Sequence, residues 1–196
     1  MYGGNITGNV YAGARMATTG ADQDENILNF YGGNITGNVF GHGSNDASVG
    51  YSNIELGGNF AITGNVFGGS NATTIGQGRI TGNTTITVNT ASANINGNIY
   101  GGSNGTINGD SINLNNGAIT GNTNVVINAG VITGNIYGGG NNCGSSGSAN
   151  ITINNGAISG DIYGGAYQNQ VRTESNIVIK GGSVNCLLYT SDAADE

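Results

Sequence analysis

Pairs of apolar residues separated by one position recur along the chain. Val125 and Ile127 form one such pair, and Ile151 and Ile153 form another. Further pairs of the same kind are Ile54/Leu56, Ile86/Val88, Ile112/Leu114 and Ile177/Ile179. A spacing of two places both apolar side chains on one face of a β-strand. No segment sustains the i, i+3, i+4, i+7 spacing of an amphipathic helix, so the pattern predicts an all-β chain.

A second motif, Ile-(Thr/Ser/Asn)-Gly-(Asn/Asp)-(Ile/Val)-(Tyr/Phe), follows most of these pairs after a short turn of small residues. Full copies begin at Ile6, Ile35, Ile62, Ile95, Ile132 and Ile158, and reduced copies without the aromatic residue begin at Ile80 and Ile119. The stretch from Tyr2 to Val10 is repeated without change from Tyr31 to Val39. Such self-similarity indicates a repeat architecture, in which each repeat buries its apolar face against its neighbours.

The spacing of the repeats predicts their geometry. Ile151 follows Val125 by 26 residues, and Ile112 follows Ile86 by the same interval, whereas other intervals are stretched by insertions. We therefore expect a single-stranded parallel β-helix, or β-solenoid, over residues 1–185, with coils of about 26 residues and loop insertions. Because neighbouring coils lie about 4.8 Å apart, six or seven of them would make a rod roughly 30 Å long.

Glycine and asparagine recur at fixed positions of the second motif. The asparagines are Asn9, Asn38, Asn65, Asn98 and Asn135, with Asp161 in the last copy. Stacked at one corner of successive coils, they are expected to form a ladder of side-chain amides. The glycines are expected to supply the positive φ angles that tight corners need.

The aromatic residues that end the motif are the only candidate ligand-binding set. They are Tyr11, Phe40, Phe67, Tyr100, Tyr137 and Tyr163. Equal positions in successive coils favour a packed column of rings, and two of the rings lack the hydroxyl that a polar ligand would use. An exposed strip of the same rings would instead stack on sugar rings. The sequence favours packing and leaves carbohydrate binding as the alternative.

Charge and hydropathy argue against several classes of function. Only 8% of the residues are charged, the net charge is −7, and the four basic residues, Arg15, Arg79, Arg172 and Lys180, are scattered. Nucleic-acid binding needs clustered Lys and Arg, so the composition argues against it. No stretch approaches the roughly 18 consecutive apolar residues of a transmembrane helix, and no signal peptide is visible in this sequence.

The sequence offers no pattern typical of a catalytic or metal site. His42 is the only histidine, and Cys143 lies in a stretch rich in glycine and serine; both are interpreted as incidental loop residues. The one acidic cluster, Asp22, Asp24 and Glu25, is interpreted as part of a solvated loop. We therefore expect a protein without catalytic residues, metal or cofactor.

Three phrases of the chain resemble repeats of bacterial surface proteins. They are GNIYGGS (97–103), GNIYGGG (134–140) and GDIYGGA (160–166), each near an ITVN, VVIN or ITIN strand. They look like the adhesin-like β-strand repeats of autotransporter passengers and related large cell-surface proteins. The resemblance covers about residues 1–185.

This resemblance implies a function as well as a fold. It implies an exported parallel β-helix at the bacterial cell surface or outside the cell, without enzymatic activity, acting as a stalk or adhesin segment. Its partners would be glycans or proteins on host or neighbouring cells. The alternative is a carbohydrate-binding or carbohydrate-cleaving β-helix protein, which clustered carboxylates beside an exposed aromatic strip would favour.

Both ends of the sequence carry expectations of their own. Met1 aligns with Phe30, so the chain is expected to start within a repeat, uncapped at both ends and able to associate end to end. At Cys186 the repeat requires glycine, as at Gly160. Residues 186–196 (CLLYTSDAADE) resemble a translated sequencing-library adapter and are interpreted as a non-native tail. We expect this tail to make few contacts apart from packing of Leu187 and Leu188; the alternative is a C-terminal cap with these two leucines as an apolar plug.

Overall fold

A computed structural model describes residues 1–13, 25–45, 50–74, 77–106, 117–169, 171, 173–185 and 187–190. The strands are β1 (Asn5–Ile6), β2 (Val10–Tyr11), β3 (Glu25–Ile35), β4 (Val39–Phe40), β5 (Tyr51–Ile62), β6 (Val66–Phe67), β7 (Thr84–Val88), β8 (Ala93–Ile95), β9 (Ile99–Tyr100), β10 (Thr123–Ile127), β11 (Val131–Ile132), β12 (Ile136–Tyr137), β13 (Ala149–Ile153), β14 (Ala157–Ile158), β15 (Ile162–Tyr163), β16 (Ser175–Ile179), β17 (Ser183–Val184) and β18 (Leu188–Tyr189). Over these ranges the chain is all-β, and it contains no helix that could span a membrane.

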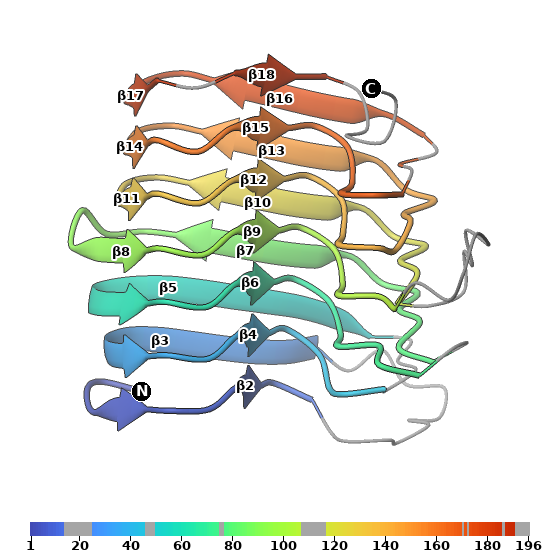
Figure 1. Ribbon diagram of the computed structural model, residues 1–196, viewed down its shortest axis with the longest axis horizontal. Coiled ribbons are helices and arrows are strands. Elements are labelled where there is room, and N and C mark those ends of the chain that lie inside the picture. Colours follow the sequence, from blue (N-terminus) through green and yellow to red (C-terminus); the bar gives the residue numbers. More distant parts are fainter. Residues whose placement is uncertain are drawn as a thin grey trace.

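The strands form two parallel sheets built from stacked layers, a layer being one passage of the chain through both sheets (Figure 1). The larger sheet has eleven strands and the smaller has seven, in the order β18-β15-β12-β9-β6-β4-β2. One layer consists of β10, β11 and β12, and the next consists of β13, β14 and β15. The long strands β3 and β5 each cover a stretch that two separate strands cover in the later layers. β5, for example, pairs with both β7 and β8.

Neighbouring layers pair in parallel, with one register shift, between Phe30 and Gly32 where β3 pairs with β5. Val125 lies beside Ile151 and Ile127 lies beside Ile153, where β10 pairs with β13. Ile132 lies beside Ile158 where β11 pairs with β14, so the predicted parallel pairing of successive motifs is confirmed.

Two parts of the repeat analysis were wrong. Ile86 pairs with Val125, so the interval of 26 residues from Ile86 to Ile112 is not the distance between neighbouring layers. The Ile112/Leu114 pair itself lies outside the described residues. The reduced motif copies at Ile80 and Ile119 pair with each other and not with the full copies, and they lie just before β7 and β10. They mark a third line of bridges, which continues through Ser145 and Val171. Their missing aromatic residue was the signal that distinguished them.

The main core follows from the alternation of apolar residues. Along β13, Ala149, Ile151 and Ile153 are buried, whereas Asn150 and Thr152 between them are half-buried on the outer face. The same alternation in β7 and β10 gives one continuous core through the layers. A single layer has no partner for this face, and stacking supplies one.

Glycine has two separate roles in the layers. Gly156, in the turn between β13 and β14, has a φ of 123°, which only glycine adopts at low cost. The motif glycines have another reason, because a Cβ added to Gly134 would meet the carbonyl oxygen of Gly97 in the neighbouring layer. Gly134 is not among the residues with positive φ, so the predicted role of the motif glycines was wrong for this position.

The contacts of residues 187–190 extend beyond the expected packing of Leu187 and Leu188. β18 pairs in parallel with β15, so that Leu188 lies beside Ile162 and Tyr189 beside Tyr163. Leu188-Tyr189 fits because it repeats the apolar-aromatic order of Ile162-Tyr163 at the matching position of the layer. Cys186 and residues 191–196 lie outside the described part of the chain, and the adapter origin of the tail stays a prediction.

Candidate functional site

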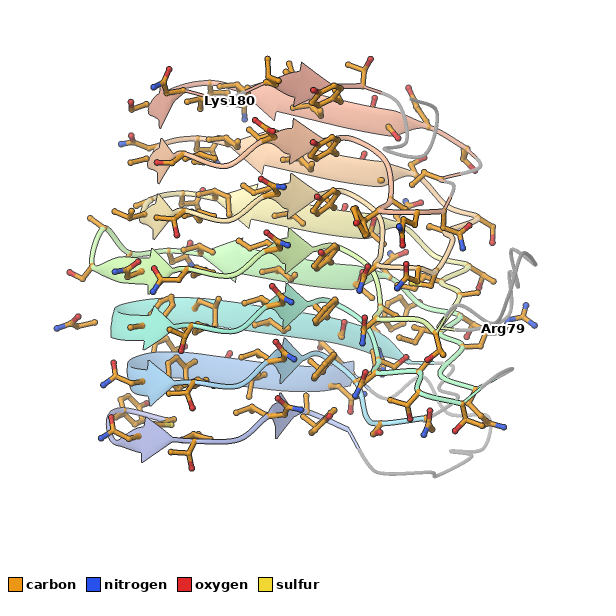
Figure 2. The ribbon with its side chains drawn as sticks, in the orientation of Figure 1. Arg79 and Lys180 are labelled. Carbon is orange, nitrogen blue, oxygen red and sulfur yellow. The ribbon has the colours of Figure 1, made fainter. Side chains whose placement is uncertain are left out.

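The aromatic residues of the motif form one continuous column of stacked rings, visible along the smaller sheet in Figure 2. Ring centroids of neighbours are 4.8 to 4.9 Å apart from Tyr11 to Tyr163, with interplanar angles of 4° to 8°. Tyr189 extends the column at a centroid distance of 4.6 Å from Tyr163. The spacing equals that of hydrogen-bonded strands, so the backbone sets the distance between the rings.

The middle of the column is shielded from solvent. Phe40, Phe67, Tyr100 and Tyr137 are buried in a cluster separate from the main core, while the outer members Tyr11 and Tyr163 are half-buried. Tyr167 packs edge-on against Tyr137 at a centroid distance of 5.6 Å. The predicted packed column is therefore present, and its central rings are not an exposed strip.

Asparagine side chains connect the column to the layer stack. Asn98 donates from Nδ2 to the hydroxyl of Tyr100 at 3.1 Å, and its Oδ1 accepts the backbone N–H of Asn135 at 2.8 Å. Asn135 repeats the arrangement with the Tyr137 hydroxyl and the backbone N–H of Asp161. The predicted amide-to-amide ladder is wrong at this corner, because the bend directs the next backbone N–H at the side-chain oxygen.

Amide-to-amide ladders do occur, at positions that the sequence analysis did not single out. Asn104 links the side chains of Asn71 and Asn141, with Nδ2 to Oδ1 distances of 2.9 and 2.7 Å. A second ladder joins Asn154, Asn128 and Asn89 on the outer face of the larger sheet. Both sets of asparagines lie outside the Ile-x-Gly-Asn motif. The sequence could have revealed them, because asparagine recurs at a constant distance from the buried residues of successive layers.

Burial suppresses ionisation of the tyrosines in the column. Loss of solvent raises the pKa of Tyr100 to about 12, although the hydrogen bond from Asn98 opposes the shift. Loss of solvent also raises the pKa of Tyr137. Near neutral pH both hydroxyls stay protonated, so they act as hydrogen-bonding groups in the stack rather than as bases.

Buried threonine hydroxyls also bond to the backbone just after two of the rings. Thr84 donates to the carbonyl oxygen of Gly101 at 2.6 Å, and Thr123 donates to that of Gly138 at 2.6 Å. Both threonines are fully buried at the start of their strands. These bonds hold the glycine segments that follow Tyr100 and Tyr137.

His42 and Cys143 lie in loops, as expected, and both are buried there. His42 is 0% exposed, and Nδ1 lies 2.8 Å from the Asn26 amide nitrogen. That amide donates, so Nδ1 accepts and Nε2 carries the proton, without a hydrogen-bond partner among the described residues. Burial lowers the pKa of His42 to about 4.

Cys143 is equally shielded. Its thiol donates to the carbonyl oxygen of Ser103 at 3.0 Å, and burial raises its pKa to about 12. A reactive thiol needs an accessible thiolate, so Cys143 is a packing residue in this environment.

Charged and metal-ligating side chains are dispersed. Within the described ranges, no three His, Cys, Asp or Glu residues lie close enough to hold a metal ion, and Asp22 and Asp24 fall outside those ranges. Arg79 projects among the loops at the right of Figure 2, whereas Lys180 lies near the top, just after β16.

A groove of mostly apolar surface lies elsewhere, over the first layers. It is lined by Ile6, Thr7, Ile35, Thr36, Ala61 and Thr63, with Asn5 and Asn34 at its side. None of the column rings lines it.

Comparison with protein-family models, curated proteins and solved structures found no match. The candidate role of the aromatic column therefore rests on its geometry. Each ring from Phe40 to Tyr163 stacks on a ring in the layer on either side. The hydroxyls of Tyr100 and Tyr137 each accept a hydrogen bond from an asparagine of the same layer. This arrangement can stabilise a stack of layers without a ligand.

Proposed function

We propose that the chain is a segment of a single-stranded parallel β-helix that serves as a non-enzymatic stalk or adhesin segment of a bacterial surface protein. The observation that carries this proposal is the continuous parallel pairing of the motif isoleucines from layer to layer. Ile62 lies beside Ile95, Ile95 beside Ile132, and Ile132 beside Ile158. Repetition of one layer produces a rod whose length depends only on the number of repeats.

The direction of the hydrogen bonds supports a stalk. Backbone bonds such as Thr133 N–H to the Ile95 carbonyl, at 3.0 Å, join one layer to the next along the stack. Side-chain ladders add bonds in the same direction, as between Asn128 and Asn154. A stack held by bonds along its length is suited to carrying a binding tip away from a cell.

The covered aromatic column favours the stalk over carbohydrate binding. Stacking on a sugar needs an open ring face, and both faces of Tyr100 are occupied by Phe67 and Tyr137. Its edge is also shielded, since Tyr100 is 4% exposed. Partner specificity would then lie in the segments inserted between layers, and the partners would be glycans or proteins of neighbouring cells.

Deleting one period tests the β-helix. Removing residues 131–156 joins Gly130 to Ala157. Ala157 then takes the place of Val131, the residue that it pairs with in the intact chain. This variant should keep its β-sheet circular dichroism and unfold cooperatively. Removing residues 131–150 is the control, because it is not a whole period and breaks the inward-outward pattern. Equal loss of structure in both variants would rule out a stack of interchangeable layers.

Two assays test the stalk. Fused between a bacterial export signal and a surface anchor, the chain should present a distal epitope tag to antibody on intact cells. The purified chain, incubated with a panel of polysaccharides, should release no reducing ends or unsaturated products. Release of either product would favour the carbohydrate-cleaving alternative over the stalk. A tag that antibody cannot reach on intact cells that produce the fusion would also contradict the proposal.

A further inference from the structure

The turn between β13 and β14 holds an asparagine side chain against the next backbone nitrogen. Oδ1 of Asn155 accepts the N–H of Gly156 at 2.8 Å. The side-chain carbonyl carbon therefore lies close to the Gly156 nitrogen. Asn155 is exposed, and Gly156 has no Cβ to obstruct an approach to that carbon.

The other Asn-Gly pairs within the described ranges are held differently. The amide of Asn104 is fixed at both ends by Asn71 and Asn141, and the N–H of Gly105 donates to the Asn141 carbonyl at 2.7 Å. Nitrogen and side chain are thus both committed to neighbouring layers.

In the pair Asn96-Gly97, the glycine packs against the backbone of the next layer, so that a Cβ on Gly97 would meet the Gly64 carbonyl. No hydrogen bond is found between the Asn96 side chain and the N–H of Gly97 in these ranges. Among the Asn-Gly pairs that the structure describes, Asn155-Gly156 is the one in which an exposed side chain lies against the next backbone nitrogen.

We propose that Asn155 is a site of spontaneous deamidation, with Gly156 as the internal nucleophile and water as the second reactant. The Gly156 nitrogen loses its proton to solvent base and attacks Cγ of Asn155. The N–Cγ bond forms, the Cγ–Nδ2 bond breaks, and Nδ2 leaves as ammonia after taking up a proton. Water then opens the cyclic imide at either carbonyl, giving aspartate or isoaspartate.

The product would act on the layer stack as well as on the turn. Gly156 accepts the N–H of Ser183 at 2.8 Å, and the adjacent Ala157 donates to the Gly130 carbonyl at 2.8 Å. Isoaspartate adds a methylene to the main chain and a negative charge at this point. The added length moves Gly156 relative to both neighbours, so the hydrogen bonds of Ala157 and Ser183 weaken.

Peptide mapping of the aged protein tests the proposal. The purified full chain is incubated in mildly alkaline buffer, folded or in denaturant, and the modified fractions of Asn96, Asn104 and Asn155 are measured by mass spectrometry. In the folded protein Asn155 should react several-fold faster than Asn96 and Asn104, while the three rates converge in denaturant. Isoaspartyl methyltransferase labelling should identify isoaspartate at Asn155, and amide exchange at Ala157 and Ser183 should accelerate with its formation.

Asn155→Ala is the matched variant, because Ala129 already precedes the equivalent Gly130 in the previous layer. It should fold normally and lose the fast modification, whereas Asn154→Ala should retain it. The proposal is overturned if folded Asn155 is as slow as Asn104, or if the fast modification persists in Asn155→Ala.

Discussion

The backbone N–H of Asn135 donates a 2.8 Å hydrogen bond to Oδ1 of Asn98 in the neighbouring layer. The bond joins residues that are 37 positions apart in sequence and occupy the same corner. It also fixes the asparagine that donates to the Tyr100 hydroxyl, so one side chain serves both the corner and the aromatic column.

Replacing Asn98 by alanine should therefore lower the free energy of unfolding. The N–H of Asn135 and the hydroxyl of Tyr100 would each lose a partner, at about 1–3 kcal/mol for a buried polar group left unpaired. Asn98→Asp should cost less, because it keeps an oxygen acceptor, as Asp161 does for the N–H of Leu187 at 3.0 Å. Urea unfolding of both variants checks the order, which an equal loss of stability would contradict.

Gly134→Ala should destabilise the chain although its backbone conformation is an ordinary one. The new Cβ would meet the Gly97 carbonyl, and such overpacking costs about 1–3 kcal/mol. Gly8→Ala is the matched control, because Gly8 occupies the same motif position and a Cβ there meets nothing within 4 Å. Thermal melts should separate the two variants, and equal melting temperatures would show that the close approach carries no cost.

Ile153→Asp should destabilise strongly, because the residue is 0% exposed and the carboxylate would have no partner in an apolar core. We expect several kcal/mol, against about 0.5–1.5 kcal/mol for the conservative control Ile153→Val. Asn154→Ala should be milder than Ile153→Asp, since it removes a half-buried ladder bond to Asn128. Denaturant midpoints give the ranking, and a stable Ile153→Asp variant would show the inward assignment to be wrong.

His42 should make folding weaken on acidification. Its pKa is about 4 in the folded chain, against an ordinary value of 6.5, so between these pH values the unfolded chain binds more protons. Its contribution to stability is complete above pH 6.5 and is lost as the pH falls towards 4, at about 1.4 kcal/mol for each pKa unit. His42→Gln should flatten this part of the stability profile while keeping an acceptor for Asn26. A profile unchanged by the substitution would contradict the assignment.

Much of the fold was visible in the sequence because its rules are local. Apolar residues at a spacing of two, as in Val125 and Ile127, define a one-sided strand wherever they occur. The interval of 26 residues between Val125 and Ile151 then predicted which strands lie side by side. The column of rings from Tyr11 to Tyr163 followed from the same repetition, since equal positions in layers in register must lie one above another.

The remaining features depended on which segments meet across layers, and the local motif does not contain that information. Ile80 and Ile119 carry the same Ile-Thr-Gly-Asn letters as Ile132, yet they lie on another line of bridges, because the position in the layer is set by the pairing of β7 with β10. His42 is fully buried and bonds to Asn26 of β3, and the loop sequence around His42 does not reveal this packing. Local patterns along the chain were therefore enough to predict the parallel strands, their inward-facing residues and the ring column. Tertiary structure decided the partner of each asparagine, the need for glycine at Gly134 and the environment of His42, because these depend on backbone atoms that are distant in sequence and adjacent only in the stack.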